Sequence, residues 1–402
     1  MLVIWLYRFV TCLFREYLYL RCTSTDEVQI AGAVPLQNPS KLKVPRYVLM
    51  TMWKKTRYYI THWETWHWLA KYIPIMPVWV WYCLKSRSLW FFTPSNPSLS
   101  FGGFLGETKQ EMYKQLPEST YPKSIYVSPA TDFHSLIKDF NAANFKYPVA
   151  VKPDAGMMGF MFRRIESEEQ LRAYHAVMKV DFILQEFINL PLEVSVFYYR
   201  YPGEQSGVIT GFLKKEFLQV IGDGSSTLGE LIKSYDRVSF RMNEMIAKHN
   251  HRLTDIIPLG EVFCLSPALN LSRGGKLISL ASQKDEKLLR IFDDLSHYTK
   301  SFYYGRYDIK CSSIEELKQG KNFSILEYNG SGAEPHHVYG DGNTLLKAYN
   351  ILLQHWKVLY RISKINNRQG IPYWSFSRGL AYSMAAKKHF KLLSRMDTEL
   401  EL

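Results

Sequence analysis

Residues 305–332 contain two apolar runs that each hold a pair of polar residues two positions apart. Arg306 and Asp308 lie on the first run, and Glu327 and Asn329 lie on the second. On a β-strand, side chains two positions apart point to the same face of the sheet. If the two runs form neighbouring strands, these four polar groups meet on one patch of an otherwise apolar sheet.

Such a patch suits a metal ion bound together with an anion. Its two carboxylates and one amide offer hard oxygen atoms, which Mg²⁺ prefers and combines with substrate phosphates. The guanidinium of Arg306 opposes a metal unless an anion, such as a triphosphate or a developing oxyanion, lies between them. A buried ion pair from Arg306 to Asp308 or Glu327 explains the same residues without a ligand, so these four leave both interpretations open.

A lysine and a glycine loop follow another apolar strand in the stretch YPVAVKPDAGMMGF. Lys152 ends the strand, and the loop runs from Asp154 through Gly156 and Met157 to Gly159. Glycines allow backbone N–H groups to approach phosphate oxygens, and the lysine adds a positive charge. The lysine precedes the glycines, so this is not the Walker P-loop. An ordinary loop after a strand is the alternative.

The stretch FILQEFINLPLEVSV indicates a strand, a short break and a second strand that carries Glu193. The edge of the first strand suits the reading of an adenine through backbone groups, and the carboxylate suits a ribose hydroxyl. A surface glutamate is the alternative, and on this stretch alone it is the favoured interpretation of Glu193.

Composition favours a folded chain with anionic partners. The 402 residues are 47% hydrophobic and 22% charged, which excludes a disordered chain and gives material for roughly two to three domains. The net charge of +13 favours nucleotides, nucleic acid or an acidic membrane surface. Five scattered cysteines without a CxxC pair indicate reduced thiols in a cytoplasmic protein, with neither a zinc site nor disulfides.

The chain divides into an aromatic and basic module (1–95), a central domain (96–342) and a helical tail (343–402). In the central part, strands and helices mix without strict alternation, which predicts an α+β fold with more than one sheet. Capping patterns predict helix starts at Thr131, at Ser167 with Gln170, and at Thr227 with Glu230.

Two apolar, aromatic runs lie in the first module, at residues 1–22 and 73–84. Each uninterrupted apolar run is too short to span a bilayer, and the first lacks the cleavage site of a signal peptide. Packing against the rest of the protein is the favoured interpretation. Peripheral contact with a membrane, as amphipathic elements, is the alternative.

Taken in order, these motifs resemble the ATP-grasp superfamily, and most clearly its D-alanine–D-alanine ligase branch. The order is Lys109 at a helix start, Lys152 with the glycine loop, Glu193, and then the GRxD and ExN motifs, over residues 105–340. The stretches VIGDGSSTLGELI and LGEVFCLSPALNLSRGG resemble the ATP-grasp part of cyanophycin synthetase and related amino-acid ligases.

The resemblance implies two α+β subdomains that close on ATP, with the glycine loop on a moving lid. The implied ATP-binding residues are Lys109, Lys152, Asp154, Gly156, Met157, Gly159, Gln185, Glu186, Phe187, Ile188 and Glu193. Of these, 185–188 would frame the adenine and Glu193 would bind the ribose. Asp308, Glu327 and Asn329 would hold two Mg²⁺ ions, for which Mn²⁺ can substitute, and Arg306 would stabilise the reacting acyl centre.

The implied activity is an ATP-dependent carboxylate–amine ligase that forms an amide through an acyl phosphate and releases ADP. An ATP-grasp phosphotransferase, or a nucleotide-binding protein without ligation, is the alternative. A basic protein that binds membrane or nucleic acid is a third class, although no nucleic-acid module is recognisable. The expected partners are small carboxylates and amines, such as amino acids or short peptides, and the oligomeric state stays open.

The stretch NGSGAEPHHVY departs from the D-alanine ligases. Ser331 is the candidate for reading a product carboxylate, and Glu334 crowds the same place. His336 or His337 is a candidate general base for the amine, and surface or capping histidines are the alternative. By the resemblance, residues 270–275 line the acceptor-substrate site.

Overall fold

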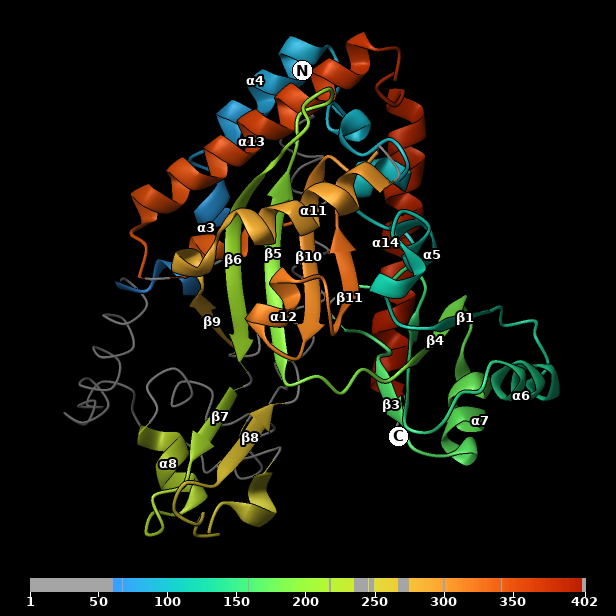
Figure 1. The fold of residues 1–402 in the computed structure, drawn as a ribbon, viewed down its shortest axis with the longest axis vertical. Coiled ribbons are helices and arrows are strands. Elements are labelled where there is room, and N and C mark those ends of the chain that lie inside the picture. The colour runs from blue at the N-terminus through green and yellow to red at the C-terminus, as the bar shows by residue number, and fades with distance from the viewer. Residues whose placement is uncertain are drawn as a thin grey trace, which may run out of the picture.

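Figure 1 shows the computed structural model. The residues that it describes are 61–66, 68–157, 159–216, 218–234, 245, 249–266, 275–298, 301–340 and 342–399. The predicted apolar run at 1–22 lies outside them, as does the expected acceptor stretch at 270–275 except for its last residue.

A five-stranded antiparallel sheet forms the centre of the molecule (Figure 1), with the strand order β11-β10-β5-β6-β9. Its strands are β5 (Leu192–Tyr199), β6 (Val208–Glu216), β9 (Lys276–Ser279), β10 (Tyr304–Cys311) and β11 (Phe323–Asn329). The helices α11 (Glu286–Tyr298) and α12 (Ile314–Lys318) cover one face. Leu288 and Phe292 of α11 pack there against Val194 and Ile309, because the apolar side of this amphipathic helix faces the sheet.

A smaller antiparallel sheet has the order β1-β4-β2-β3. Its strands are β1 (Ser124–Val127), β2 (Val149–Pro153), β3 (Arg163–Ile165) and β4 (Phe182–Glu186). The helices α6 (Phe133–Ala142) and α7 (Glu168–Val177) bury Leu136, Phe140, Leu171 and Tyr174 in a core shared with this sheet. A third unit consists of β7 (Leu218–Ile221), β8 (Val262–Ser266) and α8 (Leu228–Ser234).

The remaining helices come from the two ends of the chain, except for one short helix in the central part. They are α3 (Trp68–Tyr72), α4 (Met76–Ser86), the short α5 (Lys109–Tyr113), α13 (Leu345–Arg368) and α14 (Phe376–Glu399). α4 runs beside α13 (Figure 1), where Tyr82 stacks on Tyr360 with ring centroids 4.5 Å apart. Single turns of 3₁₀ helix lie at Trp63–Thr65, Thr93–Ser95, Ser100–Gly103, Glu118–Thr120, Asn250–Arg252, Ala281–Gln283 and His336–Tyr339.

The predicted α+β class with separate sheets is confirmed, and so are two of the three capping predictions. Thr227 and Glu230 cap each other reciprocally, and the Ser167 hydroxyl accepts from the Gln170 N–H. The prediction for Thr131 is wrong. The helix begins one residue later, and Asp132, in extended conformation, accepts from the Ser135 N–H at 3.0 Å. Among the described helices, we find none with the length and apolar character that crossing a bilayer requires.

Candidate functional site

The two polar pairs lie on adjacent strands, as the sequence predicts. Antiparallel pairing of β10 with β11 places Arg306 opposite Asn329 and Asp308 opposite Glu327. On the other side of β10, Lys310 pairs with Glu193 of β5, and Glu193 pairs in turn with Lys215 of β6. Four neighbouring strands therefore contribute polar side chains to one end of one sheet face.

An ion-pair network joins these strands. The Arg306 guanidinium donates to both carboxylate oxygens of Asp308, at 3.2 Å each. The Lys215 ammonium lies 3.0 Å from Asp308 Oδ1 and 3.2 Å from Glu193 Oε1. The ion pair that explained Arg306 and Asp308 without a ligand is thus present. The surface interpretation of Glu193 is wrong, since its carboxylate is half-buried and paired.

Burial and neighbouring charges shift the pKa values of the Asp308 and Glu193 carboxyl groups in opposite directions. Burial raises the pKa of Asp308, but the charges of Arg306 and Lys215 outweigh it and hold the pKa below its usual range. Burial also raises the pKa of Glu193, and there Lys215 offsets it only in part. Asp308 is therefore the more firmly ionised of the two.

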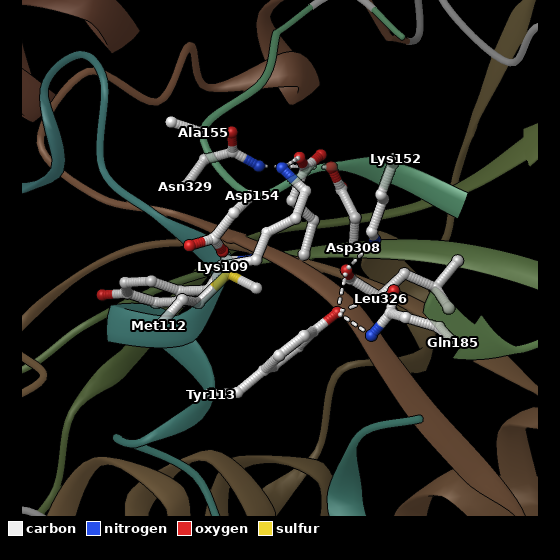
Figure 2. A network of polar contacts seen from close by, with 12 residues as sticks. Lys109, Met112, Tyr113, Lys152, Asp154, Ala155, Gln185, Asp308, Leu326 and Asn329 are labelled. Carbon is white, nitrogen blue, oxygen red and sulfur yellow. Dashed lines mark hydrogen bonds and ion pairs between the residues drawn. The ribbon is translucent and has the colours of Figure 1, made fainter. Parts of the chain in front are cut away.

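Two lysines approach this patch from outside the large sheet, as Figure 2 shows. Lys109, the first residue of α5, places its Nζ 3.4 Å from Glu327 Oε1. Lys152 of β2 donates from Nζ to the carbonyl oxygen of Leu326 at 3.2 Å. The glycine loop is close as well, because a Cβ on Gly156 would lie 3.7 Å from Lys109 Nζ. Both lysines, the loop and the polar strands thus meet at one place.

The first residue of the loop is an anchor. Asp154 accepts the Lys109 N–H at its carbonyl oxygen and the Gln110 N–H at Oδ1, both at 2.9 Å. It therefore caps the start of α5 beside Thr108, whose hydroxyl accepts from the Glu111 N–H. Further along the loop, Met157 packs against the core of the smaller sheet. Gly159 has a φ of +74°, which glycine adopts without strain.

The residues expected to frame an adenine divide into two groups. The side-chain amide of Gln185 donates to Ser124 Oγ at 2.7 Å and to the Tyr113 hydroxyl at 3.1 Å, so it ties α5 to the smaller sheet (Figure 2). Glu186 and Phe187 instead line a hollow of about 450 Å³. Its other lining residues are Lys123, Asn144, Phe145, Lys146, Tyr147, Pro148, Arg164 and Asn189. Ile188 is half-buried just beyond β4.

Lys152 loses its proton more readily than an exposed lysine does. Burial and the charge of Lys109 lower its pKa to about 7, although Glu327 and Asp154 act in the opposite direction. An anion placed between Lys109 and Lys152 would favour the charged form and reverse this shift. The charges around Lys109 and Lys152 are therefore suited to a negatively charged ligand.

The two candidate histidines are half-buried, at the start of the 3₁₀ turn His336–Tyr339, and the Nδ1 atom of each is shielded from solvent. His336 Nε2 lies 3.1 Å from Arg306 Nη1, and since arginine only donates, this ring nitrogen accepts. His337 instead packs against Gly211, where a Cβ would lie 2.3 Å from its Nδ1. Burial and Arg306 hold the pKa of His336 well below its usual range, and burial and Lys284 lower that of His337 to about 4. Both rings are therefore neutral near pH 7.

Arg306 has a further support on the N-terminal side of the molecule. Its Nη1 donates to the Glu334 carbonyl oxygen at 3.0 Å. The Glu334 carboxylate in turn accepts from the Tyr72 hydroxyl at 2.8 Å and from the Tyr339 hydroxyl. The guanidinium is therefore held from several sides before any ligand binds.

The donors fit a metal ion only together with phosphates. Among the described residues, no three His, Cys, Asp or Glu side chains gather closely enough to hold an ion. Asp308 and Glu327 are direct cross-strand neighbours, and Asn329 Nδ2 lies 3.4 Å from Asp308 Oδ2. Two carboxylates and an amide suit Mg²⁺ when phosphates supply further ligands. Binding would have to displace some of the contacts from Lys109, Lys215 and Arg306.

Lys215 is the site residue that the sequence did not reveal. The run LKKEF presents two adjacent lysines that point to opposite faces of a strand. The register with β5, which places Lys215 rather than Lys214 opposite Glu193, decides which lysine reaches the patch.

No family model matches the sequence, and no curated protein matches it. Solved structures of several ligases are similar. A D-alanine–D-alanine ligase from Bacillus anthracis matches at 13% identity and a TM-score of 0.39, over 68% of this chain and 72% of that one. The D-Ala:D-Ser ligase VanG from Enterococcus faecalis matches at 13% and 0.39, over 65% and 64%.

A bifunctional glutathione synthetase from Pasteurella multocida matches at 13% identity and a TM-score of 0.38, over 61% of this chain and only 35% of that one. The match thus spans about a third of the glutathione synthetase chain. It spans just under two thirds of the VanG chain. A likeness of this extent identifies neither a substrate nor a site residue.

Proposed function

We propose that the chain is an ATP-dependent carboxylate–amine ligase that works through an acyl phosphate with Mg²⁺. The observation that carries the proposal is the convergence of Lys109, Lys152 and the glycine loop on the Asp308–Glu327 pair. These groups are far apart in the sequence, and their order along the chain resembles the ATP-grasp superfamily.

In this proposal the two lysines and the loop of 154–159 bind the ATP phosphates. Asp308, Glu327 and Asn329 would hold Mg²⁺, which neutralises charge on the phosphates during phosphoryl transfer. Phosphoryl transfer depends on positioning and on charge neutralisation rather than on a protein nucleophile. A site made of lysines, carboxylates and an arginine, such as this one, meets that requirement.

Arg306 is assigned to the acyl centre. Attack of an amine on the acyl phosphate develops negative charge on the carbonyl oxygen, and a preorganised donor stabilises it. Asp308, His336 and the Glu334 carbonyl hold the guanidinium in position, so it does not need to reorganise during the reaction. His336 is the histidine nearer to Arg306, but its acceptor nitrogen Nε2 already receives the hydrogen bond from the guanidinium, so this ring could take a proton from the amine only once that contact is broken.

The proposed substrates are a small carboxylate and a small amine, of the class of amino acids or short peptides. A phosphotransferase, or a nucleotide-binding protein without ligation, is the alternative. Both would use the lysines and the metal residues, so the products distinguish the two functions.

The test measures ADP release by the purified protein with Mg²⁺ and ATP, with pools of amino acids, hydroxy acids and peptides supplied singly and in pairs. Mass spectrometry identifies the products. ADP release that requires two pools, with a condensed product of matching mass, supports the ligase. Release with one pool and a stable phosphorylated product would assign the phosphotransferase instead.

A matched pair of variants connects the activity to the site. Glu327→Gln removes a carboxylate that is 40% exposed, so the fold should persist. Turnover should fall by about a hundredfold or more, the effect of losing one group that stabilises transition-state charge. Glu286→Gln, at a side chain that is 87% exposed on α11, should leave turnover unchanged. Normal turnover in Glu327→Gln would contradict the metal assignment.

A further inference from the structure

The outer side of α4 is an apolar surface that includes none of the residues assigned to the candidate site. Ile73, Trp81 and Leu84 are 57%, 55% and 55% exposed, and Pro77 is also exposed. Pro77, Trp81 and Leu84 follow helical spacing along α4 and therefore share one side of the helix, while Ile73 lies in the turn just before it; these four residues are hereafter the α4 stripe. The opposite side of α4 packs on α13 through Trp79 and Tyr82, so the helix has one covered and one open side.

Basic side chains surround the α4 stripe. The Lys85 ammonium lies 5.6 Å from the centre of the Trp81 ring, and Arg87 is exposed at the end of the helix. On α13, Arg361 is exposed, and the Lys364 ammonium lies 5.7 Å from the ring of Tyr360, which stacks on α4. The apolar stripe is thus bordered by positive charge from both helices.

The segments that build this surface lack acidic residues altogether. Residues 65–106, which include α3 and α4, contain neither aspartate nor glutamate, and the same holds for residues 343–396, which include α13. Ion pairs with acidic side chains of these segments therefore cannot neutralise the lysines and arginines. A surface of one sign attracts an anionic partner and repels a second copy of itself.

We propose that the α4 stripe, with Lys85, Arg87, Arg361 and Lys364, docks this protein on an anionic lipid surface. A helix with aromatic and aliphatic side chains on one side and lysine or arginine beside them is typical of elements that lie in a bilayer interface. Tryptophan prefers this depth because its ring is amphipathic. A nucleic-acid site would use the positive charge but would leave Ile73 and Leu84 without a matching surface.

The proposal is independent of the ligase activity. In Figure 1, α4 and α13 lie at the end of the molecule opposite the β7–β8 unit. Docking through the α4 stripe would use none of the residues assigned to the candidate site.

The test measures cosedimentation of the full chain with vesicles of phosphatidylcholine, with and without about 30% phosphatidylglycerol, at about 0.05 M and about 0.5 M salt, which spans strong and weak charge screening. Two double variants probe the two components of the surface. Trp81→Ser with Leu84→Ser removes apolar groups that are more than half exposed, and Lys85→Glu with Arg361→Glu reverses the charge.

We expect the wild-type chain to bind the anionic vesicles, to bind less at high salt, and to lose at least tenfold in affinity in either double variant. Leu259→Ser, at a residue that is 81% exposed on the β7–β8 unit, and Lys138→Glu, at an exposed residue of α6, are the matched controls and should bind normally. Circular dichroism checks that each variant is folded.

Three outcomes would overturn the proposal. The first is no binding to anionic vesicles. The second is vesicle binding that both double variants retain, which would assign it to another part of the chain. The third is tighter binding to a polynucleotide than to vesicles, lost on charge reversal but kept in the Trp81 and Leu84 variant, which would assign the surface to nucleic acid.

Discussion

At the scale of single residues, Lys152 is the group whose protonation should respond most directly to a bound anion. Its ammonium donates to a backbone carbonyl, and burial together with Lys109 lowers its pKa to about 7. In the free protein it is thus largely neutral above that pH. A triphosphate bound beside it would favour the charged form and raise the pKa again.

Nucleotide binding should therefore be accompanied by proton uptake. At a pH about one unit above 7, the free lysine is mostly neutral and the bound one charged, so binding should take up nearly one proton. Affinity should fall by up to about tenfold per pH unit above the free pKa. Calorimetry in two buffers of different ionisation enthalpy measures the uptake, and Lys152→Met should abolish it. Equal binding heats in both buffers for the wild-type protein would refute the phosphate role of Lys152.

At the scale of elements, the C-terminal helix α14 fastens the loop between β2 and β3. His389 Nε2 donates to the Ala155 carbonyl oxygen at 2.6 Å. Near the other end of the loop, Asp397 Oδ1 accepts from the Met161 N–H at 2.8 Å and from Arg163 Nη1 at 3.0 Å. The loop that the resemblance places on a moving lid is thus tied at two points to a helix from the end of the chain.

Removal of one tie should loosen the loop without unfolding the protein. Asp397→Ala leaves the Met161 N–H without its acceptor, a loss of about 1–3 kcal/mol for a partly buried group. Hydrogen exchange in residues 156–163 should accelerate by about tenfold or more, since about 1.4 kcal/mol corresponds to a factor of ten. Thr398→Ala, which removes an exposed hydroxyl on the same turn of α14, is the control. Equal exchange in both variants would show that α14 does not restrain the loop.

At the scale of the whole molecule, the two ends of the chain complete the core of the central sheet. Phe91 and Phe92, from the segment after α4, share a buried cluster with Phe197 of β5 and Leu359 of α13. His355 of α13 packs against Phe197 with ring centroids 4.5 Å apart. The division of the chain at 95 and 342 stays a prediction, and the core crosses both positions.

A chain ended at residue 342 should consequently fail to fold cooperatively. Truncation removes Leu352, Leu359 and Ile362, all buried, and each large apolar side chain lost from a core costs about 2–5 kcal/mol. That sum is comparable with the whole stability of a typical domain, about 5–15 kcal/mol. Thermal unfolding followed by near-ultraviolet circular dichroism should show no sharp transition, and adding a fragment of 343–402 should restore it in part. A cooperative transition of the shortened chain alone would disprove the shared core.

The candidate site could be predicted from sequence where local rules decide. The period of a strand requires Arg306 and Asp308 to share a face, and Glu327 and Asn329 likewise, whatever the rest of the chain does. The structure adds that the two strands are direct neighbours in one antiparallel sheet. The roles in ATP and metal binding stay predictions, because they depend on ligands as well as on position.

Other features had no local signature. Register between strands selects Lys215 over Lys214, and packing between α14 and the smaller sheet brings His389 to the loop. Both depend on contacts between segments far apart in the chain, which no short pattern encodes. The sequence by itself determined which side chains share a face and which segments carry charge, since periodicity and composition are local properties. Only the tertiary structure decided which faces meet, because pairing and burial depend on the whole core at once.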